Sequence, residues 1–377
     1  MSTETAPAAA PAKKSTFKHY DALDGLRAFA IIGVVLKHIW YNIEPKPEPN
    51  PLYDWLFTGL RQMNISLMFL MLAAFSMACG YYDKLRDGRF TPDSFYTKRY
   101  KRIWPFFALM VVVDVLVTAV THHGDLTYLV PSIYEAFADL TLCFGLLPNP
   151  DISVIGVGWF IGIVFLFYIM FPFFVFLIDN KRRAWFTLAI ALLFSYVTYA
   201  YFGEDSARTL QSEFSAAFVT TDVSFKSMAI AGPIFLVGGL VFLYKDKIAP
   251  WVERHNLVML AIAVAVTACY YLVATNTDQP FVILVMSAIF DAAWISYGIG
   301  AKDRIMNSRF VKYVTKICME IFLCHMFFFR AVQFLHLENH IANGALLYLV
   351  TLILTGILTV GFSHLIKFYI FPRLKIG

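Results

Sequence analysis

Charged residues are scarce in this chain. Of its 377 residues, only 15% are charged and 59% are hydrophobic, whereas soluble domains are about 25% charged and 45–50% apolar. This composition excludes an ordinary soluble domain and predicts a membrane protein that crosses the bilayer many times. The formal net charge of +5 is small and is spread over loops, so it favours loops beside anionic lipid and gives no reason to expect nucleic-acid binding.

The five cysteines lack the patterns that cysteine chemistry requires. Most lie inside apolar runs and none forms a Cys-x-x-Cys pair, so we expect small buried side chains and neither a disulfide framework nor a zinc site. The chain also has no phosphate-binding loop, no serine-hydrolase elbow and no dinucleotide fingerprint. His122-His123 stands in a loop without other obvious ligands, and we expect no metal.

Ten apolar stretches are long enough to cross a bilayer. The sequence therefore predicts an all-α polytopic membrane protein, with a disordered cytoplasmic tail at 1–17, no cleavable signal peptide and one ten-helix domain at 18–377. The stretch 122–156 mixes apolar pieces with acids and prolines, and we expect a re-entrant or interfacial segment there. The expected spans are 22–43, 63–81, 103–121, 157–178, 185–202, 228–244, 256–275, 281–299, 313–335 and 344–368.

Basic residues alternate between the two sides of these spans. With the amino terminus inside, clusters such as 98–102 and 181–183 fall on the cytoplasmic side. The opposite loops hold only Lys46, Arg61, Arg208 and Lys226. This asymmetry predicts that both termini are cytoplasmic and that the protein is a multi-pass protein of the cytoplasmic membrane.

The first expected span carries ionisable residues that a bilayer tolerates poorly: Asp24, Arg27, Lys37 and His38. Each charge near the bilayer centre costs about 2.5–3.5 kcal/mol, so such residues usually face a bundle interior or a wet cavity. Arg27 and His38 are separated by about 16 Å along a helix and by close to three full turns, so they share one face. His38 is a candidate general base, or alternatively a histidine that only packs between helices.

Three other groups are candidates for binding. Arg99 and Arg102 share a helix face and can clamp phosphates, although a basic cluster at a cytoplasmic end is common. Trp159 and Tyr168 belong to an aromatic helix, which an interfacial belt also explains. Glu320 and His325 are ionisable groups inside the ninth span, or isolated hydrogen-bonding residues. We expect Arg330, further along the span, to extend to the outer surface.

Several of these motifs together resemble the acyltransferase-3 family of membrane proteins. The opening Leu23-Asp24-Gly25-Leu26-Arg27 is followed, after ten further residues, by His38. The Arg99-x-x-Arg102 run before Pro105, the helix from Trp159 through Tyr168, and Phe322-Leu-Cys-His325 are similar to the family's later elements. The matches occur in order along most of the chain.

The resemblance implies a ten-helix enzyme that moves an acyl group, usually acetyl, from cytoplasmic acyl-coenzyme A to a hydroxyl of a glycan or another envelope or exported acceptor. By this analogy His38 assists transfer with Asp24 orienting Arg27, and Arg27, Arg99 and Arg102 hold the phosphates of coenzyme A. Trp159, Tyr168, Glu320 and His325 are assigned to substrate binding. Apart from the lipid bilayer, the expected partners are these two substrates; the sequence contains no sign of an oligomeric state.

This chain departs from the family pattern at two places. It has Ala73-Ala74 where many members have Ser-Gly, and Val164 and Leu166 where many have a glutamate and a glutamine. An inactive relative that binds as a regulatory subunit is therefore one alternative. A carrier or flippase with the same polar helix face is another, although we see no internal repeat of the kind that many transporters have.

Overall fold

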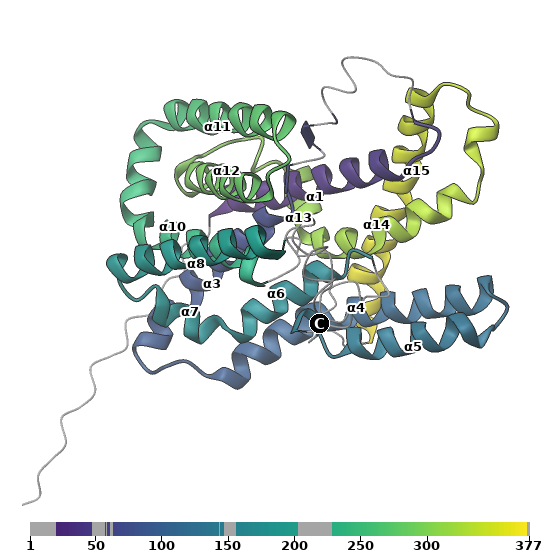
Figure 1. Ribbon diagram of the computed structural model, residues 1–377, viewed down its shortest axis with the longest axis horizontal. Helices are drawn as coiled ribbons and strands as arrows, with labels where there is room; N and C mark the ends of the chain where they lie inside the picture. Colours follow the sequence, from purple (N-terminus) through teal and green to yellow (C-terminus); the bar gives the residue numbers. More distant parts are fainter. Residues whose placement is uncertain are drawn as a thin grey trace, which may run out of the picture.

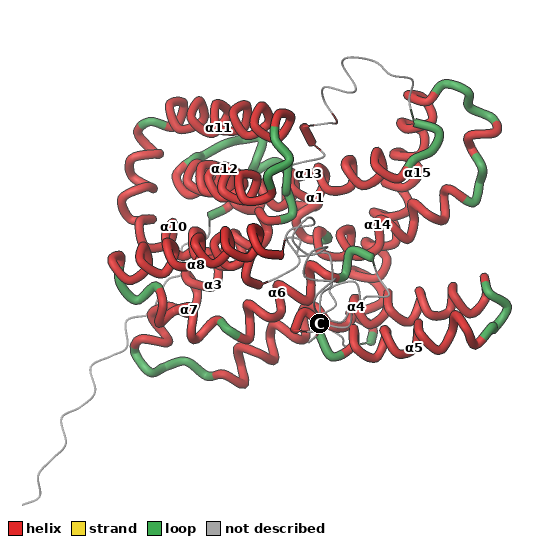
Figure 2. Tube along the Cα trace, in the orientation of Figure 1, coloured by secondary structure: helices red, strands yellow, loops and turns green. Residues whose placement is uncertain are grey.

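The structure, a computed structural model, describes residues 20–46, 57, 59–60, 63–142, 144–146, 156–202 and 228–374. These residues form helices and no strand (Figure 2), which confirms the all-α prediction. The predicted tail at 1–17 lies outside them. The helices are α1 (Asp21–Asn42), α3 (Leu67–Arg86), α4 (Pro92–Thr121), α5 (Leu126–Leu140), η1 (Phe144–Leu146), α6 (Trp159–Ile169), α7 (Phe171–Leu177), α8 (Lys181–Phe202), α10 (Met228–Arg254), α11 (Asn256–Asn276), α12 (Pro280–Gly300), α13 (Arg309–Lys316), α14 (Cys318–Gln333), η2 (Leu337–Asn339), α15 (Gly344–Leu365), η3 (Ile366–Ile370) and α16 (Phe371–Arg373).

Each of the ten apolar stretches coincides with helix in this set. Among the described residues, five helices are long and apolar enough to cross a membrane, and the bent pair α6–α7 makes a sixth if it counts as one span. The chain is therefore a multi-pass membrane protein. The ionisable residues of α1, which include Asp24 and Arg27, lower the apolarity of that helix.

α1 occupies the middle of the bundle and joins two groups of helices (Figure 1). On one side it contacts α3 and α12, which pack with α10, while α8 and α11 complete this group. On the other side it contacts α13, α14 and α15, and α14 also packs against α4. The polar face of α1 is consequently enclosed by other helices, which suits residues that lipid would not accommodate.

The segment 122–142 folds back on the long helix that precedes it. His123 and Gly124 adopt positive φ in a tight turn, and the Asp125 side chain accepts a hydrogen bond from the Thr127 backbone N–H at 2.9 Å. This cap begins α5, which runs beside α4 (Figure 1). The described part of the predicted interfacial segment is thus mostly an amphipathic helix attached to α4.

The predicted fourth span is broken into α6 and α7, which meet at an angle of 63°. Pro172 lies in the first turn of α7, and proline removes a backbone donor and collides with the preceding helical turn. The break separates the aromatic helix α6, which reaches the centre of the bundle, from the short helix α7.

Two glycines permit close helix approaches. A Cβ atom added at Gly25 of α1 would lie 2.7 Å from the Cβ of Met306, and one added at Gly238 of α10 would lie 2.7 Å from the carbonyl oxygen of Met71. Any side chain at Gly25 would push α1 away from the segment before α13, because the atoms of Met306 that it would meet are the Cβ and the backbone, which cannot move aside. The glycine between Asp24 and Arg27 therefore has a packing role.

Candidate functional site

Two cavities follow the contact between α1 and α14. The first, which we call the basic cavity, has a volume of about 180 Å³ and is lined by residues of α1, α3, α4, α6 and the α13–α14 region. The second, the histidine cavity, has a volume of about 220 Å³ and is lined by residues of α1, α4 and α14 with Gly156 and Val157. Arg27 lines the first and His38 the second, so the polar residues of α1 serve both.

The basic cavity brings together side chains that are far apart in the sequence. It has a clear excess of positive charge, because its ionisable lining residues are cations with the exception of one carboxyl group, that of Glu320. Of the residues singled out by the sequence, it contains Arg27, Arg99, Arg102, Tyr168 and Glu320; the structure adds Ser76, Lys316 and Lys367.

Arg27 is held in place by two neighbours. Its guanidinium donates to Asp24 Oδ1 at 2.8 Å and to the hydroxyl of Ser76 on α3 at 2.9 Å. A fixed guanidinium presents its remaining N–H groups in a defined direction, which favours recognition of planar or phosphate oxygens. Asp24 lies about 21 Å along the axis from His38, so it positions Arg27 and does not contact the imidazole.

Arg99 is surrounded by aromatic rings rather than carboxylates. Its guanidinium carbon lies 5.4, 5.2 and 5.5 Å from the ring centroids of Tyr81, Phe95 and Tyr168. Stacking of this kind orients the guanidinium without neutralising it. Its buried Nε has no hydrogen-bond partner in the described structure, and such a buried donor is costly unless a ligand satisfies it. Arg99 is thus the cation here best prepared for an anion.

Glu320 is the single acid of the basic cavity and is 1% exposed. Its Oε1 pairs with the ammonium group of Lys367 on η3, while Oε2 is buried and has no partner among the described residues. The ion pair joins α14 to the last helical segment. An unsatisfied carboxylate oxygen next to the cavity can accept a hydrogen bond from a bound molecule.

Three phenylalanine rings form a cluster in the wall of the basic cavity. Phe69, Phe160 and Phe322 pack against one another with ring centroids 5.4 to 6.3 Å apart, and all three line the basic cavity. Leu323, next to Phe322 in the chain, and Val157, three residues before Phe160, line the histidine cavity. The phenylalanine cluster therefore lies next to both cavities.

The histidines of the first and ninth predicted spans, His38 and His325, are in direct contact. Nδ1 of His38 lies 2.8 Å from Nε2 of His325, and the two rings are parallel to within 4°. His325 is fully buried, and its Nδ1 lies 2.8 Å from the carbonyl oxygen of Phe322 and 3.2 Å from that of Ile321. It lines neither cavity, so its position fits support of His38 better than contact with a substrate.

These contacts define the protonation pattern of a neutral pair. Carbonyl oxygens only accept, so Nδ1 of His325 carries the proton and Nε2 is its acceptor atom. His38 must then donate from Nδ1, which leaves Nε2 of His38 with a free lone pair. Because His38 is only partly buried and lines the histidine cavity, this arrangement provides an unprotonated nitrogen suited to accept a proton.

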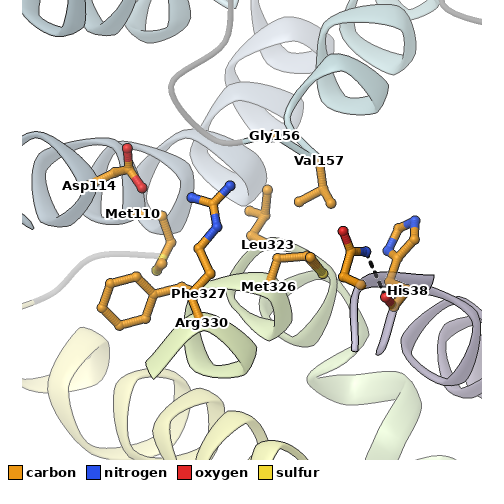
Figure 3. Close-up of a pocket in the computed structure, with 10 residues that line it drawn as sticks. His38, Met110, Asp114, Gly156, Val157, Leu323, Met326, Phe327 and Arg330 are labelled. Carbon is orange, nitrogen blue, oxygen red and sulfur yellow. Dashed lines mark hydrogen bonds between the residues drawn. The ribbon is translucent and has the colours of Figure 1, made fainter. Parts of the chain in front are cut away.

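Figure 3 shows the other polar groups of the histidine cavity. Arg330 of α14 extends between Asp114 of α4 and the region of Val157, with His38 on the opposite side. The described contacts include no ion pair between Asp114 and Arg330. Arg330 lines the cavity together with His38 and is itself exposed, so its predicted extension to the outer surface stays a prediction.

Not every predicted residue reaches the cavities. Trp159 begins α6 and packs edge-on against Phe160 with centroids 5.7 Å apart, but it lines neither cavity. Sequence reasoning missed Asp114 and Lys367. Asp114 was detectable as an acid inside an apolar span, whereas Lys367 resembled an ordinary basic residue at a helix end. The described residues contain no group of three or more potential metal ligands.

Comparisons with known proteins identify the family of the chain. The family model for an acyltransferase domain matches residues 20–367. The chain belongs to the acyltransferase-3 family. An uncharacterized protein from Haemophilus influenzae is 22% identical over 240 residues, which cover 60% of this chain and 94% of that relative. No solved structure matches the chain.

Family membership makes this protein a membrane acyltransferase by class. It also makes it useful to locate the positions at which the sequence departs from the family pattern. Ala73 and Val164 both line the basic cavity, whereas Leu166 is buried in the bundle. At these two positions the wall of the basic cavity in this acyltransferase-3 protein is therefore apolar. Ser76, one turn after Ala73, supplies the hydroxyl that contacts Arg27.

Proposed function

We propose that this protein transfers an acyl group, acetyl in the simplest case, from acyl-coenzyme A to a hydroxyl group of a glycan or another envelope or exported acceptor. The observation that supports this most directly is the pairing of the two cavities: a cationic cavity and a cavity with a histidine base are both lined by residues of α1 and α14. The proposal also includes ten spans, with both termini and the basic cavity on the cytoplasmic side of the cytoplasmic membrane.

The donor is assigned to the basic cavity. The diphosphate of coenzyme A is a strong anion, and Arg27, Arg99 and Arg102 offer guanidinium groups that bind phosphate oxygens in a bidentate manner. The pantetheine arm then extends along α1, past the rings of Phe69, Phe160 and Phe322, toward the histidine cavity. Arg27 and His38 are about 16 Å apart along α1, and the extended pantetheine arm is long enough to span this distance.

The chemistry is assigned to His38. Its Nε2 accepts the proton of the acceptor hydroxyl while the oxygen attacks the thioester carbonyl carbon. The tetrahedral intermediate then breaks its C–S bond, and the imidazolium returns the proton to the departing sulfur of coenzyme A, so the acyl group ends as an ester. His325 keeps Nδ1 of His38 protonated and therefore keeps Nε2 available.

The test uses purified protein in detergent or nanodiscs with acetyl-coenzyme A labelled in the acetyl group and extracts of envelope glycans as acceptors. We expect release of free coenzyme A thiol together with transfer of label to an acceptor hydroxyl. Transport of the acceptor without thioester consumption would overturn the proposal in favour of a carrier.

A binding protein without catalytic activity is the second candidate, favoured by the apolar residues Ala73 and Val164 in the basic cavity. Saturable binding of coenzyme A without turnover of any acceptor would support it and would contradict the enzymatic proposal. The same preparation of protein serves for both measurements.

A further inference from the structure

A second basic pocket adjoins the basic cavity on the outside of α13. This α13 pocket is lined by Arg309, Lys312, Tyr313, Lys316, His364 and Phe368, and its volume is about 370 Å³. Sites for small molecules commonly occupy about 300–1,000 Å³. The predictions from sequence assign no role to any of these residues, and the mechanism above uses none of them.

The α13 pocket is lined by the side chains of three cations and three aromatic rings, and its exposed lining is mostly apolar. Arg309, Lys312 and Lys316 follow one another at spacings of three and four residues, so they share a face of α13. Lys312 has a partner in Asp21 at 3.2 Å, whereas no ion pair of Arg309 is found in the described structure. Among the rings, the Tyr313 hydroxyl contacts Nδ1 of His364 at 2.9 Å.

The aromatic rings offer a platform for a planar group. The rings of His364 and Phe368 lie with centroids 4.9 Å apart, and Phe368 is 40% exposed. Exposed rings next to cations are the combination that binds nucleobases and phosphates together, because the ring stacks on the base and the cations contact the phosphate.

Lys316 lines both the α13 pocket and the basic cavity. A ligand whose middle lies in the basic cavity can therefore extend into the α13 pocket without leaving the protein surface. Coenzyme A has this shape, since its diphosphate connects the pantetheine arm to an adenosine that carries a separate 3′-phosphate.

We propose that the α13 pocket binds the 3′-phosphoadenosine end of the donor, with Arg309 on the 3′-phosphate and His364 and Phe368 beside the adenine. This inference rests on the proposed function, because it assumes that coenzyme A is the donor. A lipid phosphate offers similar chemistry, but it explains neither the aromatic platform nor the connection to the donor cavity through Lys316.

The test measures the dissociation constants of coenzyme A and of 3′-dephospho-coenzyme A for the full-length protein in detergent without added lipid. We expect the wild-type protein to bind coenzyme A at least about tenfold more tightly, as a charge-assisted contact to one phosphate group provides. Arg309→Gln should remove most of this preference and leave the affinity for dephospho-coenzyme A within about twofold. Lys101→Gln, an exposed cation on α4 outside both cavities, should keep the preference.

The outcomes separate this inference from the proposed function. Tight binding of both ligands without discrimination would overturn the α13 assignment and leave the donor assignment intact. Failure of the wild-type protein to bind either ligand would overturn the donor itself. If Arg309→Gln keeps the preference for coenzyme A but reduces retention of phosphatidylglycerol in nanodiscs, the pocket binds a lipid headgroup and the inference is wrong.

Discussion

The basic cavity and the histidine cavity lie along the same two helices, yet they differ in chemistry. The basic cavity contains arginines and lysines around one buried acid, whereas the histidine cavity is lined by one imidazole, that of His38, together with one amide, one acid and one arginine. The second imidazole, that of His325, is buried behind His38 and hydrogen-bonded to it. Cations are suited to hold a polyanion throughout a reaction, and an imidazole is suited to accept and return a proton. The difference indicates separate places for binding and for chemistry.

The strongest test of this division is His38→Ala. We expect kcat to fall by about 10²- to 10⁴-fold, the range for loss of a general base, while the dissociation constant for coenzyme A changes less than about twofold. Steady-state thiol release and equilibrium binding measure the two quantities. A parallel loss of coenzyme A binding would mean that the two cavities do not act separately.

The second test concerns how much the ion pair of the basic cavity contributes to the stability of the protein. Lys367→Met leaves the carboxylate of Glu320 buried without its cation. Removing one partner of a fully buried pair costs about 3–5 kcal/mol, and we expect a smaller cost here because the Lys367 side chain is partly exposed and solvent screens its charge. We expect a clear fall in the thermal unfolding midpoint, and recovery of most of it in the double variant Glu320→Gln with Lys367→Met. If the double variant were as unstable as the single one, lost packing of the lysine would be the cause.

The third test addresses the histidine pair. His325→Phe removes the acceptor of the His38 Nδ1 proton, and we expect kcat to fall by about 10- to 100-fold, as for other residues that orient a functional histidine. His325→Gln retains an amide oxygen that can accept this proton and should recover part of the activity. Equal activity of the two variants would indicate a steric role only.

The smallest expected effect is on KM, in a comparison of two neighbouring cations of α4. Arg102 lines the basic cavity and Lys101 does not. Arg102→Gln should raise KM for acetyl-coenzyme A by about tenfold, equivalent to one charge-assisted hydrogen bond, with kcat little changed. Lys101→Gln should leave both constants within about twofold. A similar rise in KM for both variants would point to a diffuse surface potential instead of a defined site.

Much of the helical content is predictable from sequence, since long apolar runs identify helices in a membrane protein. The number of spans stays a prediction, because helices such as α1 carry ionisable residues whose cost depends on what surrounds them. The order in which helices pack is not predictable in this way, because lipid-facing and buried surfaces are similarly apolar. The break at Pro172 and the return of α5 along α4 also required the structure.

The candidate site, too, is only partly predictable from the sequence. The spacing of Arg27 and His38 places both on one face of α1 because the helical period is regular. By contrast, the partners of Glu320, His38 and Arg99 lie far away in the chain or on other helices. Lys367 and Arg330 have ordinary explanations in the sequence as basic residues near helix ends, and only their positions beside the cavities suggest a role.

The sequence by itself determined that this is a helical membrane protein with a histidine and an arginine on one face of its first helix, because composition and helical periodicity are local properties. Its motifs, in their order along the chain, indicated the acyltransferase-3 family. The tertiary structure alone decided which atoms meet: His38 with His325, Glu320 with Lys367, and Lys316 between two pockets. Such contacts join segments distant in sequence, and the packing of apolar surfaces that brings them together has no signature in any one segment.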